Sequence, residues 1–149
     1  MTKRTGRPSD CYVYLLSKAT QKGQSLVQER LKKYGLTNIQ YLVLEALRKK
    51  QGLTASETGR FLSIDKATLS GVVERMVDSQ WIIRKRDETD RRLFRLYPSE
   101  KSQHLKERLI AERTAANEIL LSGFTVEDRV LLRRLLLALL SEGNITRSA

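Results

Sequence analysis

The chain has 149 residues and a mass of 17.1 kDa, the size of one domain or of one domain with a dimerisation arm. Its 28 Lys and Arg against 17 Asp and Glu give a formal net charge of +11, which points to a polyanionic partner, either nucleic acid or an anionic membrane surface. No apolar run is long enough to span a membrane. The chain has one Cys, which excludes an internal disulfide, and one Cys with one His cannot build a zinc site from soft ligands. Because residues 1–8 show no secretory signal pattern, we expect a cytoplasmic protein. We also expect it to bind no metal and no cofactor.

The chain is predicted to begin with a basic arm and a long helix. Residues 1–8 are polar and basic and end in a proline, so we expect an arm there. From residue 9 to Tyr34 apolar residues recur at steps of three and four, the period of a helix. Gly35 then stands where a left-handed C-cap is needed, so this helix should end there.

Three N-capping patterns follow and predict three shorter helices. Thr37 with Gln40 should open the second helix, and Thr54 with Glu57 should open a short third one. Asp65 is placed as the N-cap of a fourth helix that continues to about residue 80. Two short helices joined by about three residues match the helix-turn-helix.

After the fourth helix the apolar period changes from 3.6 to 2 and later returns to 3.6. Residues 81–86 and 93–97 read as two strands around a polar hairpin tip, and helices follow from Ser99 and from Thr125. The predicted fold class is mainly α with a small two-stranded β-wing: a winged helix-turn-helix flanked by N- and C-terminal dimerisation helices. The predicted segments are a basic arm (1–8), an N-terminal dimerisation helix (9–35), a winged domain (36–98), C-terminal dimerisation helices (99–142) and a tail (143–149).

The last predicted helix is apolar on nearly all sides. Residues 130–140 are almost continuous leucine, interrupted by Arg133 and Arg134. A helix of this kind is buried on several sides. It could pack onto its own domain, but we favour an interlocked homodimer, because a palindromic DNA site needs two recognition helices about one turn apart.

The predicted fourth helix would present its exposed face to the DNA major groove. The candidate contact residues there are Lys66, Ala67, Thr68, Ser70, Gly71 and Arg75, with Glu74 also on the exposed face. Lys66 can donate to phosphate or guanine, Thr68 and Ser70 can donate or accept at base edges, and small residues permit close approach. An ordinary solvated helix face would have a similar composition, and the adjacent wing favours the DNA reading.

The predicted hairpin is rich in arginine. Residues 84–95 hold six basic and three acidic residues, and a wing of this kind can place an arginine in the narrow minor groove. A carboxylate at Asp90 can accept from the guanidinium of Arg92 and fix its direction. The candidate wing contacts are Arg84, Arg86, Asp90, Arg91 and Arg92.

These motifs together resemble the MarR family of bacterial transcription regulators over residues 10–142. The matching motifs are Leu36-Thr37-x-x-Gln40-Tyr41-x-Val43-Leu44, Leu53-Thr54-x-x-Glu57, Asp65-x-x-Thr68-Leu69-Ser70 and Asp87-x-x-Asp90-Arg91-Arg92. Thr58 and Gly59 stand where the family prefers Leu-Ala, which suggests a looser third helix, and Pro98 and Ser102 replace Leu and Gly.

The resemblance implies a homodimer that binds pseudo-palindromic double-stranded DNA with Arg92 in the minor groove. It also implies a repressor released by a small aromatic or phenolic carboxylate or its CoA thioester, bound between the dimerisation helices and the winged domain. The candidate pocket residues are Tyr12, Leu15, Leu16, Lys18, Tyr41 and Leu44. Lys18 could pair with the carboxylate or be an ordinary solvated lysine.

Two alternatives stay open and one class is excluded. Cys11, near the start of the first helix, could be a redox trigger, because a helix N-terminus lowers a thiol pKa. A non-specific nucleic-acid-packaging protein would also be basic. An enzyme is not expected, because the chain offers one Cys, one solvated His104 and no glycine-rich phosphate loop.

Overall fold

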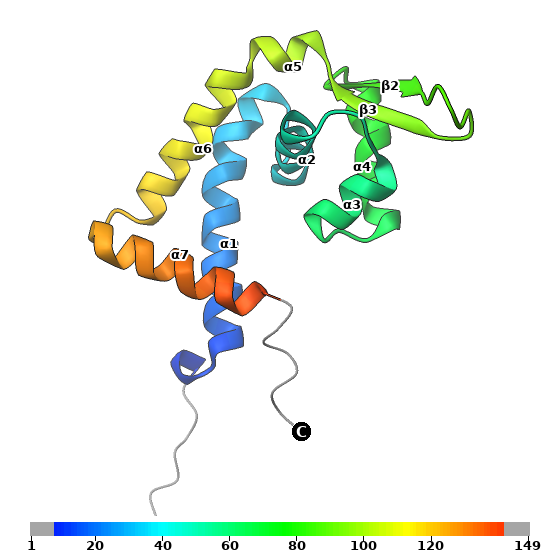
Figure 1. Cartoon of the computed structure of the whole chain (residues 1–149). Coiled ribbons are helices and arrows are strands. Elements are labelled where there is room, and N and C mark those ends of the chain that lie inside the picture. The colour runs from blue at the N-terminus through cyan, green and yellow to red at the C-terminus, as the bar shows by residue number, and fades with distance from the viewer. Residues whose placement is uncertain (1–7, 142–149) are drawn as a thin grey trace, which may run out of the picture.

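The computed structural model describes residues 8–141, so the predicted tail and nearly all of the predicted arm lie outside the described residues. Helices dominate, and a small sheet projects from one end (Figure 1). The helices are α1 (Tyr12–Leu31), α2 (Asn38–Lys49), α3 (Ala55–Leu62), α4 (Lys66–Asp78), α5 (Glu100–His104), α6 (Lys106–Leu120) and α7 (Val126–Leu140), and the strands are β1 (Leu53–Thr54), β2 (Ile82–Arg86) and β3 (Phe94–Pro98).

The predicted helix starts are confirmed by their capping hydrogen bonds. Thr37, Thr54 and Thr125 each form a complete capping box with the residue three positions on. The Asp65 carboxylate accepts from the backbone N–H of Thr68 at 2.8 Å. Gly35 has φ 69°, the left-handed conformation that its position requires, although a short 3-10 turn (Lys32–Tyr34) separates it from α1.

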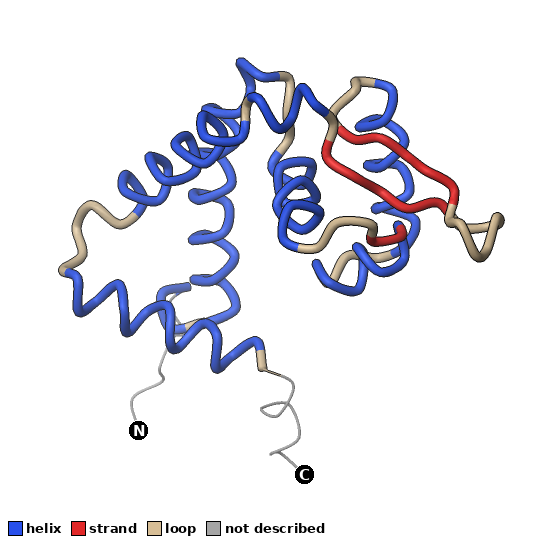
Figure 2. The backbone as a smooth tube through the Cα atoms, turned by 45° about the horizontal axis from the view of Figure 1, so that its top comes forward, coloured by secondary structure: helices blue, strands red, loops and turns tan. Residues whose placement is uncertain are grey.

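The prediction of a two-stranded wing was incomplete, because the sheet has three antiparallel strands in the order β1-β3-β2. β2 and β3 form the hairpin, with Ile82 opposite Pro98 and Arg86 opposite Phe94. β1 pairs Leu53 with Leu96 and lies on the other side of β3 (Figure 2). Two residues are too few to show a period-2 pattern, so β1 could not be predicted from local sequence alone.

The core joins the winged domain to the end of α1 and to α6. Fully buried side chains from α2, α4 and the sheet form its centre, among them Tyr41, Met76 and Trp81. Leu31 of α1 and Leu109 of α6 belong to the same cluster. The helix-turn-helix is therefore anchored to the terminal helices.

The expectation of a loose third helix was wrong. Thr58 is fully buried and donates its hydroxyl to the Thr54 carbonyl at 2.8 Å. Gly59 lies so close to the turn that a Cβ there would meet the Ile64 carbonyl at 3.1 Å and Leu69 at 3.2 Å. Glycine thus allows α3 to pack tightly against α4.

The terminal helices form a separate arm of the molecule. α1 packs along α6, and Arg30, Lys33 and Tyr34 all donate to the carboxylate of Glu112. α7 runs across α1 at the end far from the winged domain (Figure 1), and none of its residues is buried. Within residues 8–141, the leucines of α7 are therefore left exposed or half-buried.

Candidate nucleic-acid interface

A short turn fixes the angle between α3 and α4. Ser63 ends α3 in the left-handed conformation, with φ 54°, and Asp65 begins α4. The Thr68 hydroxyl donates to the second Asp65 oxygen at 2.6 Å. These bonds from Thr68 hold the pKa of the Asp65 carboxyl below its usual range. The hydroxyl proton of Thr68 is thus engaged by the cap, which leaves its oxygen lone pairs and its methyl group for a base edge.

The other predicted major-groove residues lie on the part of the α4 surface that does not face the core. Leu69, Val72, Val73 and Met76 form the buried side, and the predicted contact positions lie exposed or half-buried around the rest of the helix. Gly71 has a second use, because the guanidinium of Arg75 folds over it and lies 3.3 Å from where a Cβ would be. The side chain of Arg75 therefore lies along the exposed face of α4 at Gly71.

A buried carboxylate, Asp87, fixes the wing tip. It accepts from the hydroxyl of Thr89 at 2.6 Å and from the backbone N–H groups of Thr89 and Asp90 at 2.8 and 2.9 Å. Arg95 of β3 also donates to Asp87 and reaches the carbonyl of Gly52 at 2.7 Å. These donors hold the pKa of the Asp87 carboxyl far below its usual range. Sequence reasoning assigned no role to Asp87 or Arg95, although an Asp that opens a polar turn is a signal for such a turn.

The predicted pairing of Asp90 with Arg92 is present. Nε and Nη2 of Arg92 donate to the two carboxylate oxygens at 3.0 and 3.1 Å, while the Arg92 side chain is 90% exposed. The guanidinium of Arg92 lowers the pKa of the Asp90 carboxyl. Arg86 instead supports the wing, since it donates to the Arg91 carbonyl at 2.9 Å and lies over the Phe94 ring.

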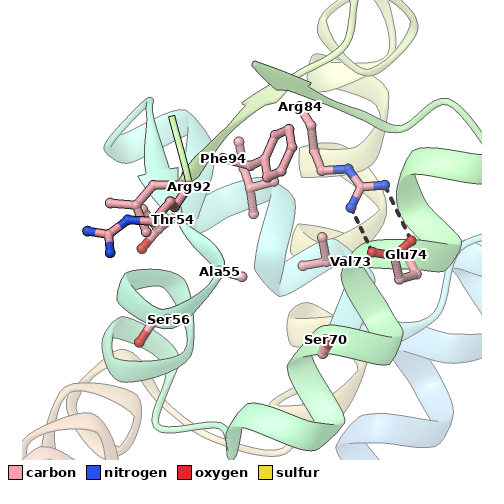
Figure 3. A pocket seen from close by; sticks show the side chains of 11 residues that line it. Thr54, Ala55, Ser56, Ser70, Val73, Glu74, Arg84, Arg92 and Phe94 are labelled. Carbon is pink, nitrogen blue, oxygen red and sulfur yellow. Dashed lines mark hydrogen bonds and ion pairs between the residues drawn. The ribbon is translucent and has the colours of Figure 1, made fainter. Parts of the chain in front are cut away.

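Arg84, a predicted wing contact, is paired with a residue of α4. Its two terminal nitrogens donate to the carboxylate of Glu74 at 2.7 and 3.3 Å (Figure 3). The pair borders a cavity of about 240 Å³ between α3, α4 and the wing, which is also lined by Ser70 and Arg92. The exposed side of α4 and the wing arginine therefore face one common space.

The structure does not bring the six predicted pocket residues together. Tyr41 and Leu44 are fully buried in the core, and burial raises the pKa of the Tyr41 hydroxyl. Tyr12, Leu15 and Lys18 are exposed along α1, where Lys18 donates to Gln21 of its own helix at 3.2 Å. Within one chain, the candidate residues of α2 thus lie in the core, whereas Tyr12, Leu15 and Lys18 of α1 lie on an exposed face.

An apolar cavity lies elsewhere, among the terminal helices. Its volume is about 510 Å³, and of the six predicted pocket residues Leu16 is the one that lines it. The other walls come from α1, the end of α6 and α7, with Gly23, Leu120 and Leu136 among them. Lys22 supplies a cation at this cavity.

Cys11 and His104 line neither of these two cavities. Cys11 is exposed at the N-cap of α1. His104 is exposed on α5, with its Nδ1 3.1 Å from the Glu100 carbonyl. Within residues 8–141 no group of His, Cys, Asp and Glu could hold a metal ion, and no helix in that range is long and apolar enough to cross a membrane.

A helix-turn-helix, an arginine-bearing wing and a supporting arm of long helices define a winged-helix transcription regulator rather than an enzyme. The sequence profile described as the MarR family matches residues 34–93. Among curated relatives, YybA of Bacillus subtilis, an uncharacterised helix-turn-helix regulator, is 26% identical over 112 residues, 75% of each chain. The repressor NicR of Pseudomonas putida is 28% identical over 123 residues, which cover 83% of this chain and 78% of NicR. Matches to other curated regulators span about half of those proteins.

Solved structures agree with this assignment. A probable transcriptional regulator from Pseudomonas aeruginosa is 28% identical with a TM-score of 0.85 and covers 90% of this chain and 100% of its own. BpsR of Bordetella bronchiseptica, whose DNA binding is regulated by 6-hydroxynicotinic acid, is 25% identical with a TM-score of 0.82. The match covers 88% of this chain and 94% of BpsR. The chain is thus similar to the MarR family of transcriptional regulators in both its profile match and its fold.

Proposed function

We propose that this regulator binds a pseudo-palindromic site in double-stranded DNA as a homodimer, with α4 in the major groove and Arg92 in the minor groove. The observation that carries the proposal is the wing tip, where Asp90 holds an arginine that is 90% exposed. Arg92 and Ser70 of α4 border the same cavity, so one duplex could meet both (Figure 3). The narrow minor groove has the negative potential that attracts such an arginine.

The proposed dimer rests on the uncovered helix α7. More than half of the surface is exposed at Val130 (64%), Leu135 (52%) and Leu139 (53%). The N-terminal half of α1 is also exposed and apolar, at Tyr12 and Val13. Exposed apolar patches of this extent mark an interaction site. A second copy would cover both helices and set two recognition helices about one DNA turn apart.

We further propose that the protein is a repressor released by a small aromatic carboxylate. Support comes from the repressor NicR and from BpsR, whose DNA binding is regulated by a hydroxylated aromatic acid, 6-hydroxynicotinic acid. The cavity beside Leu16 suits such a molecule, because its walls are apolar and Lys22 can face a carboxylate. A ligand there would act on the dimer arm and so on the distance between the two recognition helices.

Selection from a pool of randomised duplexes at one fixed salt concentration tests the DNA proposal. The full chain should enrich an inverted repeat, and adding an aromatic carboxylate such as 6-hydroxynicotinic acid should release the selected duplex. A packaging protein would enrich no sequence, and this result would overturn the proposal.

A further inference from the structure

An acidic side chain, Glu74, lies on the outer face of the proposed recognition helix. It follows Ala67 and Gly71 at steps of four and three, so the three residues share the face opposite Leu69 and Met76. Ala67 and Gly71 add little side-chain bulk of their own to this face, where the Arg75 guanidinium lies over Gly71, so position 74 could come close to the base edges. Glu74 is exposed, with 53% of its side chain accessible.

Arg84 of β2 fixes the orientation of the Glu74 carboxylate. The guanidinium donates to both carboxylate oxygens, at 2.7 and 3.3 Å, and lies over the ring of Phe94 with 5.8 Å to its centre (Figure 3). The cation offsets the repulsion that a lone carboxylate would meet from the phosphates. A carboxylate has about four acceptor sites, and those not facing Arg84 are left for another donor.

The chemistry of the major groove selects the base that such a group can read. A carboxylate accepts hydrogen bonds and donates none, so it needs a donor on the base edge. Guanine shows two acceptors there, thymine shows an acceptor and a methyl group, and adenine pairs its donor with an adjacent acceptor. Cytosine shows the N4 amino donor without an acceptor beside it, and it is the base that Glu and Asp contact.

We infer that Glu74 is a specificity-determining residue that accepts a hydrogen bond from N4 of a cytosine in each half-site, and that Arg84 is the positioning residue of this contact. The inference rests on the proposed function, since it assigns a base to the face of α4 that would lie in the major groove. It also gives Arg84 a purpose other than a direct wing contact.

Selection from randomised duplexes with the full-length Glu74→Gln variant tests the inference. The parent should require cytosine at one position of each half-site. The variant should require adenine at that position, because a glutamine amide can pair with both N6 and N7 of adenine, and preferences elsewhere should stay the same. We expect a reversal of about tenfold in relative affinity for duplexes that differ at that base pair alone.

Two further variants separate base reading from charge and from support. Glu88→Gln removes one charge from the exposed wing tip and should change overall affinity without changing the selected sequence. Arg84→Met keeps an unbranched chain against Phe94 but removes the guanidinium, so it should weaken the cytosine preference and leave other positions unchanged. Arg84→Lys should restore part of that preference, because lysine restores the charge but has no second nitrogen for the bidentate contact with Glu74.

The outcomes distinguish the inference from the proposed function. If the parent selects a defined inverted repeat and Glu74→Gln selects the same one, Glu74 reads no base and the inference is overturned. A reversal at a position where the parent prefers a base other than cytosine would equally contradict it. If the parent enriches no sequence at all, the proposed function itself fails.

Discussion

At the scale of single residues, one carboxylate decides where the wing arginine points. Asp90 binds two nitrogens of Arg92 and leaves the rest of that side chain exposed. A freely rotating arginine would lose more side-chain entropy on entering the minor groove than one already held. The affinity of the wing for DNA should therefore depend on Asp90 as well as on Arg92.

Arg92→Ala should weaken binding to the selected duplex by about 2–6 kcal/mol for a dimer, roughly 30-fold or more, because it removes a charge-assisted contact from each subunit. The loss should be largest for the specific duplex and smaller for a scrambled one, as titration of both at one salt concentration would reveal. Equal affinity of variant and parent would exclude Arg92 from the interface.

Asp90→Ala should also weaken binding, although it makes the protein more positive. Simple electrostatics predicts the opposite sign, and Glu88→Ala supplies the matched control, since it removes an exposed acid from the same turn without touching Arg92. Operator titrations should rank the affinities Glu88→Ala, then parent, then Asp90→Ala. If Asp90→Ala binds as tightly as Glu88→Ala, the wing is a diffuse basic patch.

Cys11 permits a test between the two proposed triggers. If a small ligand causes release, Cys11→Ser should bind the operator and respond to the aromatic carboxylate as the parent does. Peroxide treatment of both proteins provides the comparison. A peroxide-dependent release that the parent shows and the variant lacks would establish the redox trigger instead.

At the scale of elements, the wing keeps its shape through contacts that span the domain. Asp87 closes the turn, and Arg95 joins it to the Gly52 carbonyl at the start of β1. Because the folded state lowers the pKa of Asp87, its ionised form stabilises the fold fully above the unfolded pKa of about 4, and this stabilisation is lost as the pH falls below that value.

Asp87→Asn should therefore lower the melting temperature at neutral pH and reduce the loss of stability on acidification. The melting temperatures of parent and variant, measured by circular dichroism between neutral pH and about pH 2, should approach each other progressively below about pH 4, because the lowered pKa of Asp87 delays its protonation in the folded state. Other carboxylates contribute equally to both proteins, so the difference isolates Asp87. A constant difference across the range would contradict this role.

The helix starts and the wing differ in how far the sequence could predict them. Each capping box depends on two residues three positions apart, so Thr37 and Thr54 could be placed from local pattern alone. β1 and the contact of Arg95 with Gly52 depend on residues 43 positions apart, which no local period reveals. The burial of Tyr41 was out of reach for the same reason, since it depends on packing by elements far along the chain.

At the scale of the whole molecule, the exposed apolar face of α7 requires a partner in the proposed account. Sedimentation equilibrium at micromolar concentration should give about 34 kDa, twice the 17.1 kDa of the chain. Leu135→Lys should shift the protein toward the monomer and weaken DNA binding, because it puts a charge on the proposed interface. The control Asn117→Lys, on the exposed side of α6, should stay dimeric. A monomeric parent would contradict the dimer.

The most direct test of a symmetric dimer that reads two half-sites is the spacing between them. The selected duplex should bind two chains, and its half-sites should lie about one helical turn, or roughly 10 base pairs, apart. Inserting about 5 base pairs at the centre turns the half-sites to opposite faces of the duplex, while about 10 base pairs restore the face. Titration should show a loss of affinity to the level of a scrambled duplex with the half-turn insertion. Unchanged affinity for that duplex would contradict the account.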